Sequence, residues 1–483
     1  MKRNYINGKK LLSGILLAVS SLAASAQMIT FQKHYPTTYD ESGKDVYPTA
    51  DGGYLIAATT ENTIVNDLDI ILVKTNSVGD ILSTKTYGGN RVEYPNSMIP
   101  TSDGNFFIVG YSNSYGSGDQ NIYLLKVNQA GDTIFTRVYG GYGNEEGKEI
   151  IATADGNYAI VGASNSISFS NNDMTLMKID LNGAVLWTKY YGTPQYESAR
   201  SVKLCPDGGF IISGKSSANP GTIASIMLVK TDAAGDTTWT KMISGGSNSY
   251  EGKSILANSD GTYTIAIDDS SATSDSDVRI MKLDAAGGQV WNKMYGGPDK
   301  DICKTIRSTT DGGYIVGAIS RSFGWINPDM WIIKLDANGD QSWTQHFGGT
   351  GHEHCYSARQ TSDGGYIAVG HARSYSSSWE IYLIKMDAAG LVGIKEFAAD
   401  SKLAVYPNPS NGIINVDLSE GTEYSTFTIT NTLGQTVYSE NLDALRGNQM
   451  QTMRIDLKDN ERGIYFVTLQ SATHSITKKL ILN

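Results

Sequence analysis

Residues 290–340 read VWNKMYGGPDKDICKTIRSTTDGGYIVGAISRSFGWINPDMWIIKLDANGD, and this stretch decides the fold. Four short runs rich in apolar and aromatic residues predict β-strands, at 290–295, 302–309, 314–317 and 330–335. The Asp311-Gly312 pair between the second and third runs predicts a tight turn with positive φ, which glycine adopts without strain. No helical period occurs in the stretch, so it predicts a small antiparallel sheet.

The same pattern recurs seven times along the chain, about 52 residues apart, which is the signature of a repeat architecture. Each copy carries an aspartate that begins the tight turn: Asp51, Asp103, Asp155, Asp207, Asp260, Asp311 and Asp363. The second and third strands of a copy are almost continuously apolar, which indicates strands buried on both faces. Four-stranded sheets covered on both sides predict a seven-bladed β-propeller. A solenoid is the alternative, although solenoids have shorter repeats and atypical terminal copies.

The two ends of the repeat region predict a closed ring. The fourth-strand pattern already occurs at residues 29–35, before the first complete copy, whereas residues 392–397 lack the aromatic residue of that strand. We therefore expect residues 29–35 to complete the seventh blade. Closure leaves no exposed sheet edge.

The composition limits the compartment and the partners. Basic residues followed by an apolar run and Ala24-Ser25-Ala26 predict a secretory signal peptide at residues 1–26. No other apolar segment is long enough for a membrane span, so we expect none in the mature chain. The net charge of -10 argues against nucleic acid as a partner. An odd set of three cysteines, Cys205, Cys303 and Cys355, argues against a disulfide framework.

The repeat stops near residue 399, where a different pattern of alternating strands begins. Its marks are Tyr406-Pro407-Asn408-Pro409, the Leu-Gly434-Gln segment, the Gly463-Ile-Tyr465 segment and a final strand with Lys478 and Lys479. These residues resemble the type A C-terminal sorting domain of the type IX secretion system. The resemblance implies an immunoglobulin-like β-sandwich at residues 399–483, recognition by the outer-membrane translocon and removal by a sortase. Residues 27–398 are then the propeller, exported through the periplasm to the cell surface or the medium.

A carboxylate precedes the first strand of every copy, nine or ten residues ahead of the turn aspartate. The set is Glu41, Glu93, Glu145, Glu197, Glu251, Asp301 and Glu353. The first strand of a propeller blade lies nearest the axis, so these acids are expected to form a ring around the central channel. They either bind a cation or polar ligand, or accept backbone N–H groups of the adjoining loop in each blade; their regularity favours the second interpretation.

Four of the six histidines occur close together in the sequence, at positions 346, 352, 354 and 371. A transition-metal or proton-transfer site formed by His352, His354 and His346 is one hypothesis, since imidazole suits both roles. Polar residues at a surface corner are the alternative, because no spacing here matches a strong metal motif. No other cofactor is predicted.

The loops between the second and third strands vary most, and the last two contain Phe323, Trp325, Tyr375 and Trp379. Variable loops on a rigid scaffold often carry recognition, and aromatic rings stack on sugars or peptides. Shielding of the blade edges is the alternative role. The sequence therefore predicts an exported module that binds a glycan or an extracellular protein. A secreted hydrolase or lyase acting on polysaccharide or peptide, and a structural adhesin, are the competing hypotheses.

Overall fold

The computed structural model describes residues 29–37, 39–62, 67–166, 171–270, 277–323, 327–392, 403–418, 425–431, 435–442, 451–470 and 475–483. The chain divides into two compact units, residues 1–392 and 393–483. All regular elements of the described residues are β-strands. Within these residues, no helix is long and apolar enough to cross a membrane. The expected signal peptide and the predicted boundary at residues 398 and 399 lie outside them.

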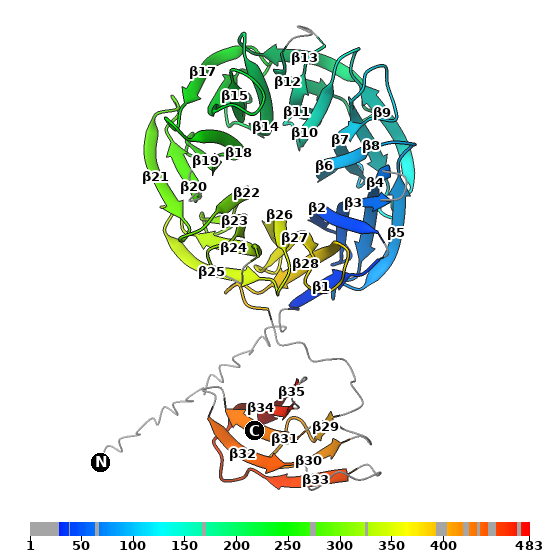
Figure 1. The fold of residues 1–483 in the computed structure, drawn as a ribbon, viewed down its shortest axis with the longest axis vertical. Helices are drawn as coiled ribbons and strands as arrows, with labels where there is room; N and C mark the ends of the chain where they lie inside the picture. The colour runs from blue at the N-terminus through cyan, green and yellow to red at the C-terminus, as the bar shows by residue number, and fades with distance from the viewer. Residues whose placement is uncertain are drawn as a thin grey trace, which may run out of the picture. The chain divides into compact units, whose positions relative to one another are not determined.

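The first unit contains seven four-stranded sheets arranged as a ring (Figure 1). Blade 1 contains β2 (Asp40–Pro48), β3 (Tyr54–Asn62), β4 (Asp67–Thr75) and β5 (Ile81–Tyr87). Blade 2 contains β6 (Glu93–Pro100), β7 (Phe106–Ser112), β8 (Asn121–Val127) and β9 (Thr133–Tyr139). Blade 3 contains β10 (Glu145–Ala152), β11 (Tyr158–Ser164), β12 (Asp173–Ile179) and β13 (Val185–Tyr191). Blade 4 contains β14 (Tyr196–Leu204), β15 (Phe210–Ser217), β16 (Ala224–Thr231) and β17 (Thr237–Ile243).

The remaining three blades repeat this order. Blade 5 contains β18 (Ser249–Ala257), β19 (Tyr263–Ser270), β20 (Val278–Leu283) and β21 (Gln289–Tyr295). Blade 6 contains β22 (Asp301–Ser308), β23 (Tyr314–Ser320), β24 (Asp329–Leu335) and β25 (Gln341–Phe347). Blade 7 contains β26 (Glu353–Gln360), β27 (Tyr366–Ala372), β28 (Glu380–Met386) and β1 (Phe31–Tyr35). The expected seven-bladed propeller is confirmed, with the first strand of each blade nearest the centre (Figure 1).

The N-terminal strand closes the ring as the sequence predicts. β1 pairs antiparallel with β28, which joins the two ends of the propeller in one sheet (Figure 1). From β1, Lys33 forms an ion pair of 2.7 Å with Asp80, and the Tyr35 hydroxyl donates to the Gly79 carbonyl at 2.8 Å. Tyrosines at the end of the fourth strand donate in the same way in several other blades. The outermost strand of each such blade is thus fixed to the hairpin of the next blade.

Apolar contact between blades supplies the core. The second and third strands bury nearly every side chain, as in β7 and β8. Separate apolar clusters fill the spaces between neighbouring sheets; the one between blades 7 and 1 contains Phe31, Val46, Ile71 and Ile381. Cys205, Cys303 and Cys355 are buried and unpaired within this core. Burial on both faces explains why these strands lack the alternation of a half-exposed strand.

The second unit contains two sheets around one core. One sheet has the order β29 (Leu403–Tyr406), β30 (Ile413–Leu418) and β33 (Gln451–Asp456). The other has the order β32 (Thr436–Asn441), β31 (Thr426–Asn431), β34 (Gly463–Gln470) and β35 (Ser475–Leu482). Ile414 and Val416 of the first sheet share a buried cluster with Phe427 and Val467 of the second. The unit is therefore a β-sandwich, as expected.

Candidate functional site

The carboxylates of the predicted ring begin the innermost strands, and most of them are saturated with hydrogen bonds. Glu353 is fully buried and accepts backbone N–H groups of Gly349, Arg373 and Ser374 at 3.0, 3.3 and 3.0 Å. Other members receive an equivalent backbone N–H from the preceding corner: Glu93 from Gly89, Glu145 from Gly141, Glu197 from Thr193 and Asp301 from Gly297. These contacts support the structural interpretation of the ring, since saturated acceptors have little capacity left for a ligand.

Blade 5 departs from the predicted ring. In blade 2 the ring carboxylate, Glu93, lies opposite Ser112 in the strand register. The equivalent pair in blade 5 is Tyr250 and Asp269, and Glu251, one position further along, lies opposite Asp268. The prediction that Glu251 occupies the ring was therefore wrong by one position. Asp269 supplies the buried carboxylate of this blade and forms a 2.7 Å ion pair with Arg279. Glu251 instead contributes its charge to the channel.

The predicted histidine site is divided between two clusters. His346 stacks on Trp331 with ring centroids 5.5 Å apart and contacts Phe323. The ring centroids of His354 and His371 lie 4.6 Å apart. Both of these rings contact Trp379, as does the ring of His352. Burial lowers the pKa of His354 to about 4, so this ring is neutral at pH 7. No group of three or more metal-ligating side chains is gathered anywhere in the part of the chain that the structure describes.

The predicted aromatic loop residues pack mainly on other aromatic rings. Phe323 contacts Trp331, and Tyr375 contacts Tyr382 and stacks on His34 at 4.6 Å. Phe323 and Tyr375 remain 47% and 42% exposed, so each ring still presents an edge to solvent. Trp325 lies outside the described residues. Phe323 and Tyr375 thus have a structural role, whatever they bind.

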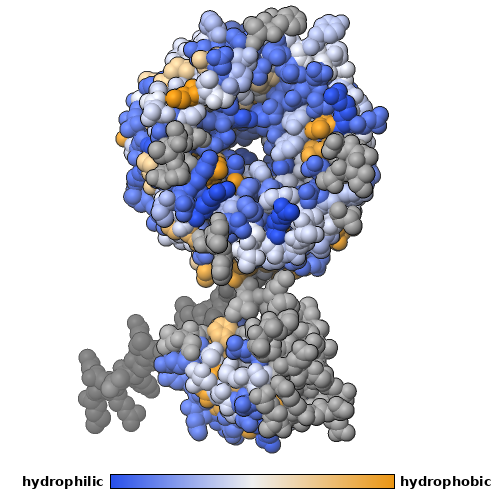
Figure 2. All heavy atoms as spheres, in the orientation of Figure 1, coloured by the Kyte–Doolittle hydropathy of each residue, from blue (hydrophilic) through white to orange (hydrophobic). Residues whose placement is uncertain are grey.

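The channel-facing side chains of the innermost strands are basic in five blades and differ in the other two. Residues of the innermost strand alternate between the blade interior and the channel, as the burial of β6 shows. Seven equivalent channel positions, one in each blade, line a cavity of about 470 Å³: Lys44, Asn96, Lys148, Arg200, Lys253, Lys304 and Tyr356. Tyr94, Tyr111 and Glu146 complete its wall. We call this cavity the channel mouth; the hollow at the centre of the ring is surrounded mainly by hydrophilic surface (Figure 2).

Carboxylates neutralise the basic side chains over blades 3 to 5. Lys148 is paired with Glu146, and Arg200 with Glu251. Lys253 lies 2.5 Å from Glu251 and 3.4 Å from Asp268. Burial, followed by the charge of Arg200, lowers the pKa of Lys148 to about 8. This half of the channel mouth has little unbalanced charge.

The opposite half, over blades 6, 7 and 1, carries unbalanced positive charge. Lys44 lies over the rings of Tyr94 and Tyr356, at 4.8 and 4.3 Å from their centroids, and Lys304 lies 6.0 Å from Tyr356. Among the described residues, neither lysine forms an ion pair, and Asp268 and Glu251, which pair with Lys253, act on Lys304 from a greater distance. Burial and the neighbouring charge of Lys304 lower the pKa of Lys44 to about 7. An anion placed here would restore the charge of Lys44 and compensate its desolvation.

A chain of hydrogen bonds holds Lys44 in this position. Its ammonium group donates to the Ser42 hydroxyl at 2.8 Å, and that hydroxyl lies 2.8 Å from Nδ1 of His371. His371 Nε2 is buried and has no hydrogen-bond partner among the described residues. Lys44 is therefore oriented before any ligand arrives, which lowers the entropic cost of binding.

A narrower part of the channel beside the mouth is closed by buried ion pairs. Arg359 binds Asp45 at 2.6 Å, and Lys203 binds Glu149 at 2.5 Å. Burial alone would raise the pKa of Asp45, but the Arg359 and Arg307 guanidinium groups hold it below its usual value. This part of the channel encloses about 100 Å³. Its small volume and paired charges leave little room for a ligand.

The marks of the sorting domain lie on its strands and connections. Tyr406 ends β29, and Asn408 of the Pro407-Asn408-Pro409 segment donates to the Lys479 carbonyl at 2.6 Å and accepts from the Ile481 N–H at 3.0 Å. Gly463 and Tyr465 belong to β34, where Tyr465 is buried, and Lys478 and Lys479 belong to β35. Gly434 lies outside the described residues. The Asn408 segment thus ties the start of the domain to its last strand.

Comparison with known proteins identifies this unit. Residues 404–483 match the family model described as the secretion system C-terminal sorting domain. The C-terminal unit is a secretion-system sorting domain. A type IX sorting domain supports export to the cell surface or medium and interaction with the secretion machinery.

Other similarities are weaker. A segment covering 22% of the chain is 25% identical over 122 residues to regulatory protein FlaEY of Caulobacter vibrioides and spans only 13% of that protein. A polysaccharide lyase of family 25, an ulvan lyase, superposes with a TM-score of 0.49 and 11% identity over 74% of this chain and 96% of that one. Pyrococcus horikoshii acylaminoacyl peptidase superposes with a TM-score of 0.42 and 10% identity, over 79% of this chain and 58% of the peptidase chain. Values this low transfer no activity to the propeller.

Proposed function

We propose that the propeller is an exported binding module whose channel mouth holds an anionic saccharide, such as a uronate or a sulfated sugar. The observation that carries the proposal is the pair Lys44 and Lys304 on either side of Tyr356, without a carboxylate partner in the described residues, while the other half of the mouth is neutralised. A buried ammonium group without a counter-ion is costly. A ligand carboxylate or sulfate would supply that counter-ion.

The other walls of the mouth favour a sugar over a bare inorganic anion. Tyr94 and Tyr111 stack on each other at 5.4 Å, and Tyr356 offers a third ring beside the lysines. Tyrosine combines an apolar face with a polar tip, which suits the faces and hydroxyls of a sugar ring. The cavity of about 470 Å³ is within the usual range for small-ligand sites. Charge thus selects the acidic group and the tyrosines select the ring.

Calorimetric titration of the full-length mature protein tests the proposal. An acidic oligosaccharide such as oligogalacturonate is compared with an uncharged one such as a xylo-oligosaccharide. We expect binding of the acidic ligand alone and its loss in Lys304→Met. Lys85→Met is the matched control, because Lys85 pairs with Asp132 at the surface. Equal binding of both ligands, or unchanged binding by Lys304→Met, contradicts the proposal.

A lyase activity on the same ligand is the second candidate, and the lowered pKa of Lys44 is the observation that favours it. In β-elimination a base removes the proton beside the uronate carboxylate, the electron pair forms a C=C bond, and the glycosidic bond to the leaving oxygen breaks. Lys44 in its neutral form is in position to accept that proton, and the Tyr356 hydroxyl, whose pKa is raised by burial, to donate one to the leaving oxygen, with Lys304 beside the carboxylate. Ultraviolet absorbance of the unsaturated product separates the candidates, since a binding module leaves the oligosaccharide intact.

We also propose that the translocon recognises the sorting domain and that a sortase removes it after export. The sorting family assigned to residues 404–483 supports this step. Mass spectrometry of the exported protein provides the test. A product ending near the boundary between the two units is expected, and recovery of the full chain at the cell surface would contradict removal.

A further inference from the structure

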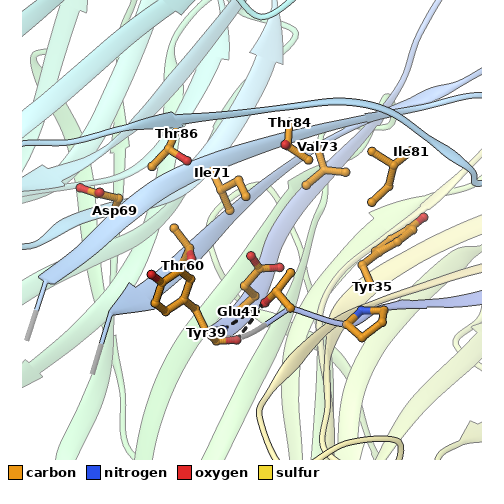
Figure 3. Close-up of a pocket in the computed structure, with 12 residues that line it drawn as sticks. Tyr35, Tyr39, Glu41, Thr60, Asp69, Ile71, Val73, Ile81, Thr84 and Thr86 are labelled. Carbon is orange, nitrogen blue, oxygen red and sulfur yellow. Dashed lines mark hydrogen bonds between the residues drawn. The ribbon is translucent and has the colours of Figure 1, made fainter. Parts of the chain in front are cut away.

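A second pocket lies between blades 7 and 1, at the place where the ring closes. It encloses about 550 Å³ and is lined by β1, β2, β3, β4, β5 and the connection after β1. Figure 3 shows Val73, Ile81 and Tyr35 toward one end, Asp69 toward the other, and Ile71 and Glu41 between them. We call it the closure pocket. It has an apolar end and an acidic end.

The pocket exists because blade 1 has a medium-sized side chain where most blades have a large one. The position of Ile71 on the third strand is occupied in blades 2, 5, 6 and 7 by Tyr123, Arg279, Trp331 and Tyr382. Trp331 and Tyr382 are each 1% exposed and fill the corresponding space. Ile71 reaches less far, so the space between blades 7 and 1 stays open. Its size follows from one residue rather than from a loop.

The acidic end differs from the corresponding place in other blades. Glu41 is 4% exposed, and its hydrogen-bond partners are the hydroxyl groups of Thr37 and Thr60. Burial, together with the charge of Glu380, raises the pKa of Glu41 to about 7. A cation beside Glu41 would favour its charged form. Asp69 of the same pocket adds a second carboxylate.

We propose that the closure pocket binds a primary amine with an apolar or aromatic body. The ammonium group lies against Glu41, and the body packs on Ile71, Val73 and Tyr35. A metal ion is a poorer fit, because no group of three or more His, Cys, Asp or Glu side chains that could hold one is gathered in the described residues. The acidic end excludes the anions proposed for the channel mouth. The two sites therefore select ligands of opposite charge.

Blade 3 provides an internal comparison. Thr175 occupies the position of Ile71 there, and a pocket of about 430 Å³ remains between blades 2 and 3. Its carboxylate, Glu145, already accepts the Gly141 N–H at 3.0 Å and the Ser164 hydroxyl at 3.1 Å. The Ser166 hydroxyl also donates to Glu145, so this carboxylate has three donors where Glu41 has two, and it gains less from an ammonium ligand. We therefore expect the amine at the closure pocket and not at its counterpart.

Ligand-observed NMR on the full-length mature protein tests this inference with phenethylamine as the probe and phenethyl alcohol as its uncharged counterpart. Ile71→Tyr fills the closure pocket with the residue that blades 2 and 7 carry at that position, so the fold is expected to tolerate it. Glu41→Gln removes the charge and keeps the shape. Thr175→Tyr is the matched control in blade 3.

The amine is expected to bind the wild type and Thr175→Tyr alike, and to bind Ile71→Tyr and Glu41→Gln at least ~10-fold more weakly, which corresponds to the loss of one charged contact. Equal binding of amine and alcohol would overturn the role of Glu41. Retained amine binding in Ile71→Tyr would overturn the location. Neither result bears on the channel mouth, whose ligand is an anion.

Discussion

The blade junctions and the channel mouth are built from the same repeat, but the junctions keep the same residues from blade to blade and the mouth does not. At the junctions, a buried carboxylate accepts N–H groups of the preceding corner in blade after blade, as Glu93 and Glu353 do. At the mouth, equivalent positions hold lysine, arginine, asparagine and tyrosine. A feature that every blade needs is repeated, whereas a ligand site on a ring requires that blades differ. The irregular positions of this repeat therefore carry its recognition.

Removing a junction carboxylate should have the largest effect. Glu353→Ala leaves the partly buried N–H groups of Gly349 and Ser374 without their acceptor, and we expect it to lower the free energy of unfolding by about 2 kcal/mol. Glu251→Ala, at the mouth, should cost about 1 kcal/mol or less because its partners stay in contact with water. Denaturant unfolding measures both. Equal losses of unfolding free energy in the two variants would contradict the distinction between the junctions and the mouth.

Removing an unpaired lysine of the mouth should have the next largest effect. Lys44→Met deletes a charged contact to the anionic ligand, so we expect affinity for an acidic oligosaccharide to fall roughly 10- to 30-fold. The unfolding midpoint should stay the same or rise, since the variant no longer buries an ammonium group. Calorimetry and thermal unfolding provide the two readouts. Lower stability together with unchanged affinity would place Lys44 among the structural residues.

The pH dependence of binding should follow the lowered pKa of Lys44. The group faces Lys304 and the rings of Tyr94 and Tyr356, and its pKa is about 7 in the free protein. An anion binds the protonated form, so affinity should be greatest below pH 7 and decrease as the pH rises through 7. Titrations between pH 5.5 and 9, roughly spanning the pKa, test this, and Lys44→Met should flatten the profile. Affinity that increases with pH would have the wrong sign.

The smallest expected effect concerns the neutralised half of the mouth. Glu251→Gln releases Arg200 and Lys253 from their common partner, so affinity for the acidic oligosaccharide should rise about threefold. The same change at the junction, Glu353→Gln, should leave affinity unaltered. Surface plasmon resonance resolves differences of this size. Weaker binding by Glu251→Gln would show that Arg200 and Lys253 need their carboxylate in order to be positioned.

The fold was predictable because the same strand and turn signals occur in seven copies. The turn aspartates, the apolar second and third strands and the early copy of the fourth strand at residues 29–35 predicted the blades and the closure. The one error in the ring had a visible sign: Glu251 stands nine residues before its turn aspartate, where the other six acids stand ten before theirs. Tyr250 has the regular spacing. Glu251 stands one position further along the strand, so its side chain points to the other face, toward the channel.

The channel mouth was harder to predict, although its residues occur at a regular spacing in the sequence. The basic residues of the mouth stand three residues after the ring position of their blade, and this spacing recurs through the repeat: Lys44, Lys148, Arg200, Lys253 and Lys304. In blade 5 the ring position is Tyr250. Sequence alone did not show which of these bases has a carboxylate beside it, because Arg200 meets Glu251 from the next blade. His371, distant in sequence from Ser42, orients Lys44 through it. Contacts between blades decide the charge balance, and the order of residues within one copy does not contain them.

Charge reversal at the mouth tests the central claim most directly. Calorimetry would compare an acidic oligosaccharide binding to the wild-type mature protein, to Lys44→Glu/Lys304→Glu and to Lys85→Glu/Lys189→Glu, where the second pair lies on outer strands and contacts Asp132 and Asp236. The account predicts that the mouth variant loses binding completely while the outer variant keeps the wild-type affinity. Binding that survives reversal at the mouth, or that disappears with reversal at the rim, would contradict it.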